Sequence, residues 1–153
     1  MPDTKTGPDV TGLYFELFNE IGIISQLSRA SFEARLPDGM VLPHFSVINH
    51  LIRVQDGRTP LQLARAFQVP KTSMTHTLAG LEKRGLVEMR ANPDDARSKQ
   101  VWLTEAGRTF RDEAIASLAP DVTEISDALE PDEVAEMIAT LARLRKRMDA
   151  ARD

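Results

Sequence analysis

The chain has 153 residues, a formal net charge of −4 and no cysteine. The lack of cysteine excludes a disulfide scaffold, a thiolate zinc site and an iron–sulfur cluster. No apolar run reaches the roughly 18 residues that a membrane span needs. Because 42% of the residues are hydrophobic, the chain can bury a core as one domain or two small ones. We therefore expect a soluble cytoplasmic protein with no cofactor, no metal and no membrane contact.

Charge is divided unevenly along the chain. Residues 1–57 carry 4 basic and 7 acidic groups (−3), residues 58–111 carry 10 and 5 (+5), and residues 112–153 carry 5 and 11 (−6). A basic middle between acidic flanks is typical of a segment that meets a polyanion, although chance clustering on a solvated surface gives the same totals.

The first third of the chain predicts two helices. Residues 1–9 are polar and contain two prolines, which favours a disordered lead-in and no signal peptide. From Leu13 to Leu27 apolar residues recur with a helical period, and the breakers at 37–39 end that helix. A second helix is expected over residues 43–55, stopped by Asp56-Gly57.

The middle third predicts two short helices followed by a hairpin. Helices are expected over residues 61–67 and 70–84, with Gly85 as the helix-ending glycine. The period then changes from 3.6 to 2, which indicates strands around residues 87–90 and 100–103 joined by a polar turn at 91–98.

The last third predicts helices throughout. Thr104 caps a helix that we expect to continue to Leu129 past a kink at Pro120. Pro131 begins the final helix, which carries a heptad-like seam at Val134, Met137, Leu141, Leu144 and Met148. The seam fits packing against a partner chain, because the two ends of the chain offer more apolar helix surface than the small middle covers. Packing within its own chain is the alternative.

Two short helices, a break and a hairpin are the element order of a winged helix-turn-helix, in which the second helix enters the DNA major groove. The helix at 70–84 has a predicted buried stripe of Met74, Leu78 and Leu81. Its other side begins with short polar donors, a composition that suits contacts with phosphates and base edges. An ordinary amphipathic helix with a solvated Ser/Thr-rich face is the alternative interpretation.

Several segments together resemble the MarR family of transcriptional regulators over roughly residues 12–148. They are Leu42-Pro43-His44-Phe45, residues 61–75, Leu81-Glu82-Lys83-Arg84-Gly85-Leu86-Val87, the turn at 92–99, residues 101–107 and Pro131-Asp132-Glu133. The resemblance implies a mainly α fold with a small β-hairpin wing. It implies a winged helix-turn-helix domain at 40–111 and a helical dimerisation region at 10–38 and 112–150.

The resemblance also implies a homodimer that binds a pseudo-palindromic operator in double-stranded DNA and is released by a small, aromatic effector. Arg97 matches the family's minor-groove arginine and Asp95 the acid that braces it, although an ordinary surface ion pair is the alternative. The predicted DNA-binding residues are Lys71, Thr72, Ser73, Thr75, His76, Thr77, Arg90, Asp95, Arg97 and Lys99. The predicted dimerisation residues are Leu13, Leu17, Val134, Met137, Leu141, Leu144 and Met148.

The sequence departs from the family pattern at three positions. His76 stands where an arginine is common, Gly80 where a basic residue is common, and Pro70 where a capping serine is usual. These changes bear on the operator sequence and on affinity rather than on the fold.

Two further groups of residues are candidates for a binding site or a contact. Tyr14, Phe18, His44 and Phe45 combine apolar surface with polar tips and are the candidate effector pocket, with plain core packing as the alternative. His44 and His50 are six residues apart, so they favour a surface or subunit-contact pair over a metal site.

No motif in the sequence supports catalysis. The paired acids at 94–95 and 132–133 have structural explanations as a turn and a helix start. We therefore expect a ligand-responsive repressor and no enzyme. A winged-helix dimeric adaptor that binds protein rather than DNA is the alternative, favoured by the acidic pI and by His76 and Gly80.

Overall fold

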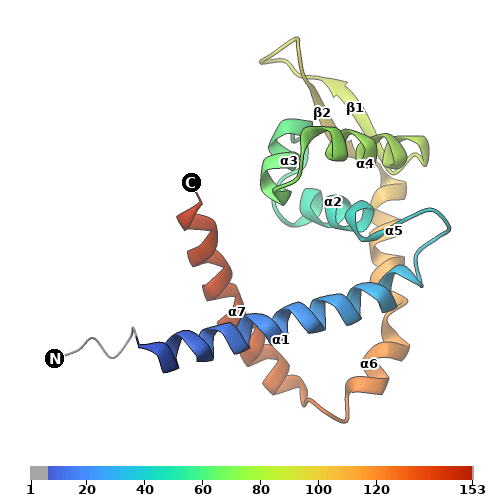
Figure 1. The fold of residues 1–153 in the computed structure, drawn as a ribbon. Coiled ribbons are helices and arrows are strands. Elements are labelled where there is room, and N and C mark those ends of the chain that lie inside the picture. The colour runs from blue at the N-terminus through green and yellow to red at the C-terminus, as the bar shows by residue number, and fades with distance from the viewer. Residues whose placement is uncertain (1–6, 153) are drawn as a thin grey trace. The chain divides into compact units, whose positions relative to one another are not determined.

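A computed structural model describes residues 7–152 and forms two compact units, Met1–Ser117 and Leu118–Asp153. Within the described residues there are seven helices and one two-stranded antiparallel sheet (Figure 1). The elements are α1 (Pro8–Glu33), α2 (Leu42–Arg53), α3 (Pro60–Phe67), α4 (Lys71–Lys83), β1 (Val87–Ala91), β2 (Lys99–Leu103), α5 (Glu105–Ala116), α6 (Ala119–Ile125) and α7 (Pro131–Ala151). The predicted mainly α fold with a small hairpin is confirmed.

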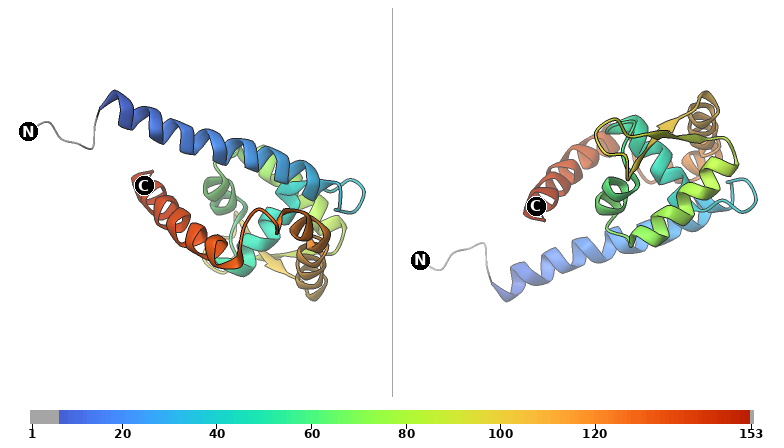
Figure 2. Two further views of the ribbon diagram at one scale, coloured as in Figure 1. Left: turned by 90° about the horizontal axis from the view of Figure 1, so that it is seen from below. Right: turned by 90° about the horizontal axis from the view of Figure 1, so that it is seen from above.

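Helix α1 begins earlier than the sequence predicts. Pro8 occupies its first turn and Asp9 follows, so the predicted disordered lead-in is wrong for these two residues, and residues 1–6 of it lie outside the described part. Proline is tolerated at the start of a helix because its missing N–H would have no partner there, and an acid is stabilised by the helix dipole. Both views in Figure 2 show α1 as one continuous helix.

Helices α2, α3 and α4 pack around a shared apolar core with the hairpin. Fully buried side chains come from every one of these elements, namely Ile48, Leu51, Leu63, Leu78, Leu81, Val87 and Val101. The tight turn between α3 and α4 passes through Gln68, which adopts a left-handed conformation (φ 53°). Thr59 caps α3 by accepting from the Gln62 amide at 3.2 Å.

The hairpin forms where the alternating sequence predicts two strands, and its register places their apolar residues together. Val87 lies opposite Leu103, and Ala91 opposite Lys99, so Val87, Val101 and Leu103 face the core. A single bridge between Arg58 and Val101 adds a short third segment to the other edge of β2. In Figure 1 the connection between β1 and β2 extends beyond α3 and α4 as a wing.

The predicted single helix from Thr104 to Leu129 is wrong, because the chain forms two helices there. Thr104 does cap α5, accepting from the Gly107 amide at 3.0 Å, but α5 ends at Ala116 and α6 begins at Ala119. Pro120 has no N–H for an α-helical bond and its ring clashes with the carbonyl four residues earlier, which favours a break over a kink. The first compact unit extends through α5 to Ser117, and the functional division predicted at residue 111 stays a prediction.

The second unit contains α6 and α7. Helix α7 starts at Pro131 as predicted, and the Glu130 amide donates to the Glu133 carboxylate at 2.9 Å as part of a capping box. None of the helices in residues 7–152 is both long and apolar enough to cross a membrane.

Candidate nucleic-acid interface

The first two turns of α4 present a polar face away from the core. The buried stripe is the predicted one, with Met74, Leu78 and Leu81 between 0% and 3% exposed. Opposite this stripe the side chains reach solvent, and Thr77 is half-buried at the edge; the exposed residues are Lys71, Thr72, Ser73, Thr75 and His76. All the predicted contact residues of this helix therefore lie on one surface.

The hydroxyl groups on this face are not equivalent. Thr75 Oγ1 donates to the Lys71 carbonyl at 2.9 Å, and Thr77 Oγ1 donates to the Ser73 carbonyl at 3.1 Å. Their protons are used within the helix, so these threonines offer acceptor lone pairs and methyl groups instead. Methyl groups suit the C5-methyl of thymine, whereas Lys71 and His76 carry nitrogen donors for phosphates and base edges.

The start of α4 is open to an anion. Pro70 occupies the N-cap position, and among residues 7–152 no side chain caps the first amides of this helix. A serine there would accept from one of those amides, so its replacement by proline leaves the amides to solvent or to a ligand. Backbone N–H groups and the helix dipole at such an end attract phosphate.

Gly80 lies against His44. A Cβ atom at residue 80 would stand 3.0 Å from His44 Nε2, and His44 Nδ1 accepts from the Val41 amide at 3.0 Å. Burial, followed by the positive charge of Arg84, lowers the pKa of His44 below its ordinary value of 6.5. His44 is thus a packing residue between α2 and α4, and a larger residue at 80 would disturb that contact.

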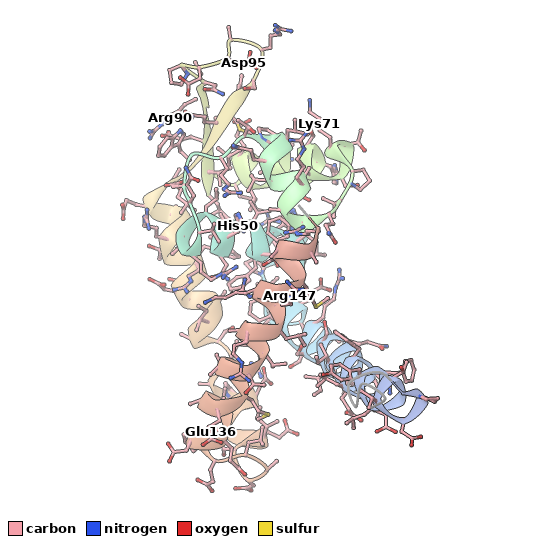
Figure 3. The ribbon with its side chains drawn as sticks, turned by 90° about the vertical axis from the view of Figure 1, so that its left-hand side faces the viewer. His50, Lys71, Arg90, Asp95, Glu136 and Arg147 are labelled. Atoms are coloured by element: carbon pink, nitrogen blue, oxygen red, sulfur yellow. The ribbon has the colours of Figure 1, made fainter. Side chains whose placement is uncertain are left out.

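The wing tip is built from local hydrogen bonds between side chains and the backbone, which leave the Arg97 side chain exposed to solvent. The Asp94 amide donates to Asn92 Oδ1 at 3.0 Å, and the Arg97 amide donates to Asp95 Oδ1 at 2.9 Å. The Arg97 side chain is 97% exposed, and its Nε lies 4.0 Å from Asp95 Oδ1. Asp95 therefore holds the backbone of Arg97 more firmly than it holds the Arg97 guanidinium. Figure 3 shows Asp95 at the tip, at the same end of this unit as Lys71.

Arg90 and Lys99 lie on the wing strands below the tip. The Arg90 guanidinium forms an ion pair with Glu88 and stands 5.0 Å from the centroid of the Trp102 ring. Its place on the wing is shown in Figure 3. Because Arg90 already makes these two contacts, it would have to leave them to reach a phosphate. Lys99 is exposed at the first position of β2.

The four residues predicted to line one effector pocket do not come together within a protomer. Phe45 packs edge-on against Phe32 near the end of α1, with 4.7 Å between ring centroids, and His44 packs against Gly80. Tyr14 and Phe18 lie on the same helix as Phe32 but about 27 Å and about 21 Å away along it, at about 1.5 Å of rise per residue. One chain alone does not bring the four residues together, and the effector pocket between the dimer helices and the DNA-binding part stays a prediction.

His44 and His50 each pack within the chain, and their predicted role as a surface or subunit-contact pair stays a prediction. Six residues on a helix point them in different directions, and His50 packs against Phe67 at 5.3 Å between ring centroids. Burial, then the charges of Arg58 and Arg53, lowers the pKa of His50. In the part of the chain that the structure describes, no three His, Cys, Asp or Glu side chains gather as a metal site would require.

The residues predicted for dimerisation leave much apolar surface uncovered. In α1, Leu13 is 65% and Leu17 41% exposed, and their neighbours Tyr14 and Phe15 are also exposed. In α7, Met137, Leu141 and Met148 are exposed, while Val134 and Leu144 are half-buried. A second chain would have to bury these faces for the predicted dimer to form, and their role remains a prediction.

Two residues that organise this surface were missed by the sequence analysis. Arg84 donates from its guanidinium to the Asp38 carbonyl and so links the end of α4 to the turn before α2. Asp56 bonds to the base of the wing across 47 residues. The sequence marked Asp56 only as a helix stop, because long-range partners leave no local pattern.

The comparisons with known proteins agree with this architecture. A family profile described as MarR family matches residues 38–98, from the turn before α2 to the wing tip. The transcriptional regulator BldR from Sulfolobus solfataricus matches with a TM-score of 0.74 and 26% identity, over 93% of this chain and 99% of that chain. Wild-type apo MarR from E. coli matches with a TM-score of 0.70 and 25% identity, over 84% of this chain and 96% of that chain.

A third solved structure contains nucleic acid. It is a mutant MarR from E. coli complexed with operator DNA, which matches with a TM-score of 0.66 and 25% identity over 84% of this chain and 93% of that chain. The profile covers the helix-turn-helix, β1 and the turn of the wing, and the solved structures extend the likeness to most of the chain. This chain is therefore similar to winged helix-turn-helix transcriptional regulators of the MarR family, through the profile over residues 38–98 and through solved structures over most of its length.

Proposed function

We propose that this protein is a repressor that binds a pseudo-palindromic DNA operator as a homodimer and is released by a small, aromatic effector. The observation that carries DNA binding is the shared surface of the open, donor-rich start of α4 and the nearly fully exposed Arg97 at the wing tip. The operator complex of the E. coli relative supports it. Asp95 supports Arg97 in this proposal and Arg90 is secondary, because it is engaged with Glu88 and Trp102. The proposed contact residues are Lys71, Thr72, Ser73, Thr75, His76, Thr77, Arg97 and Lys99.

In this proposal α4 enters the major groove and Arg97 reaches the adjoining minor groove. The two copies of α4 in the dimer would lie roughly 34 Å apart, one turn of the duplex. Exposed apolar faces on α1 and α7 support a second chain as partner. An effector that changes the separation of the two α4 helices would weaken DNA binding by the loss of simultaneous fit.

A gel-shift titration with DNA from upstream of the protein's own coding region tests DNA binding. Arg97→Ala is expected to raise Kd on the order of tenfold or more, as the loss of one specific contact of roughly 1–3 kcal/mol predicts. The matched control is Arg143→Ala, which removes the same charge from an exposed position of α7 in the other unit. Raising the salt concentration should weaken wild-type binding because phosphate contacts release counterions.

Failure to bind the upstream DNA would lead to selection from random sequences. If no selected sequence bound, DNA binding would be refuted and the adaptor alternative would be tested next. A bound operator then serves to screen aromatic acids for release, and a reporter gene under that operator distinguishes repression from activation.

A further inference from the structure

One carboxylate joins three elements at the base of the wing. Asp56 lies in the loop between α2 and α3, and its Oδ1 accepts from the Gly57 amide and from the Leu103 amide, each at 3.0 Å. Its Oδ2 lies 3.8 Å from an Arg108 guanidinium nitrogen. Leu103 ends β2 and Arg108 belongs to α5, so the loop, the wing and the following helix meet at this side chain.

The carboxylate extends the sheet where the backbone does not. On the edge of β2 that faces away from β1, the Val101 amide donates to the Arg58 carbonyl at 2.8 Å, and the Gly57 amide donates to the Val101 carbonyl at 3.0 Å. Amides of alternate residues face the same edge of a strand, so the Leu103 amide is the next one along. Asp56 takes that amide and acts in place of a third strand.

The same loop also clamps the outer face of the wing. Gly57 has a φ of +72°, and a Cβ there would lie 2.4 Å from the ring of Trp102. The loop backbone therefore lies directly against the indole, with the Arg90 guanidinium 5.0 Å from the indole centroid. The amide bonds hold one edge of β2, and this contact holds the indole that β2 carries.

The wing acts as a lever whose pivot is this attachment. Strands rise about 3.3 Å per residue, so β2 and the turn beyond it place the tip about 20 Å from Leu103. A tilt of about 10° at the base would move such a tip by about 3 Å. That displacement exceeds the tolerance of a hydrogen bond and would take Arg97 away from its contact.

We infer that Asp56 is a positioning residue for the wing, and that it sets operator affinity through Arg97 without touching DNA. This inference rests on the proposed DNA binding. It assigns the effect to the bonds made by Oδ1, since Arg108 is half exposed and more distant. Asp56→Asn keeps an oxygen that can accept from both amides, whereas Asp56→Ala removes it.

A double-mutant cycle separates positioning from direct contact. Operator Kd is measured for wild type, Asp56→Ala, Arg97→Ala and the double variant, with Asp112→Ala as a surface-carboxylate control in α5. Asp56→Ala is expected to raise Kd about tenfold in the wild-type background and less than about twofold in the Arg97→Ala background, because coupled residues are not additive. Asp56→Asn and Arg108→Gln should each stay within about threefold of wild type.

A readout independent of DNA accompanies the cycle. NMR amide exchange of Leu103 should speed up about tenfold in Asp56→Ala while the core amide of Leu78 keeps its protection, and Asp56→Asn should change little. This measurement also reveals whether Asp56→Ala unfolds. If it does, the operator Kd of Asp56→Asn is compared with that of Asp56→Ser, because the serine hydroxyl is too short to reach both amides.

The outcomes discriminate between the proposals. Additive effects of Asp56→Ala and Arg97→Ala, or unchanged exchange at Leu103, would overturn the positioning role. If wild type binds no operator by any selection, the proposed function fails and with it the effect on affinity, while the exchange data still decide whether Asp56 orders the wing. Non-additive effects of Asp56→Ala and Arg97→Ala on Kd, together with faster amide exchange at Leu103, would support the positioning role of Asp56.

Discussion

Gly107 is the point where α5 approaches the turn between α4 and β1 most closely. A Cβ at this residue would lie 2.2 Å from the Leu86 carbonyl oxygen and 3.3 Å from Leu103 Cδ2. The backbone cannot simply withdraw, because the Gly107 amide donates to Thr104 Oγ1 at 3.0 Å and that hydroxyl donates to the Gly85 carbonyl at 2.7 Å. Gly107→Ala should therefore destabilise the winged unit.

The magnitude follows from the displacement required. Carbon–oxygen contacts shorter than about 3.3 Å are rare, so α5 would have to move by about 1 Å. Overpacking of a core typically costs about 1–3 kcal/mol, and weakening the Thr104 bonds adds about 1 kcal/mol. The gain in helix propensity over glycine offsets up to about 1 kcal/mol. A net loss of about 1–3 kcal/mol should lower Tm by about 3–10 °C in a chain of this size.

Circular dichroism during thermal and urea unfolding measures this loss. Gly22→Ala is the matched control, because nothing lies within 4 Å of its Cβ position in the middle of α1, and it should raise stability by about 0.5–1 kcal/mol. Opposite signs for the same substitution would isolate the steric term. A Gly107→Ala protein that melts at or above the wild-type temperature would refute the close approach of α5 to Leu86.

Three further predictions concern pH, assembly and the wing. The folded state lowers the pKa of His44 below 6.5, so the unfolded state binds more protons as the pH falls below that value. The free energy of unfolding should therefore decrease on acidification below about pH 6.5. His44→Gln should flatten part of that fall in urea titrations from about pH 7.5 to about pH 5.5. Leu141→Asp should convert a dimer to monomer in sedimentation equilibrium, and a persistent dimer would remove Leu141 from the interface. Asp95→Ala should weaken operator binding less than Arg97→Ala, within about fivefold, because an exposed pair at 4.0 Å contributes under about 1 kcal/mol. An equal loss would make Asp95 a direct contact.

Most helices could be predicted because their boundaries depend on neighbouring residues. Thr59 and Thr104 cap the helices that follow them, and the breakers at 37–39 and at Gly85 lie where helices have ended. The break before α6 was misjudged because the pattern at 105–129 keeps its apolar period through Pro120. Periodicity shows which residues face one side, but it does not show whether the backbone bonds continue.

Exposure on α4 could likewise be predicted, since a buried stripe at Met74, Leu78 and Leu81 fixes which side faces outward. The effector pocket stays a prediction, because its residues were chosen by composition. Tyr14 and Phe18 share the composition of a pocket with His44 and Phe45, but within one chain the continuous helix α1 keeps them far from Phe45. Composition carries no information on distances between residues in the fold. The reason for a glycine at residue 80 likewise becomes clear only from the structure, where His44 packs against it.

The wing shows why hydrogen bonds between sequence neighbours can be predicted from the sequence, whereas hydrogen bonds between distant residues cannot. Arg97 was predicted from the family resemblance, and the turn that carries it has a local pattern, because Asn92 and Asp95 bond to amides two residues away. The orientation of that turn depends instead on Asp56, whose partner Leu103 is 47 residues distant. The first kind of bond shapes the tip and the second fixes where the tip points. In the proposed function operator affinity depends on both, so we expect a change at Asp56 to alter DNA binding even though every residue of the wing itself is unchanged.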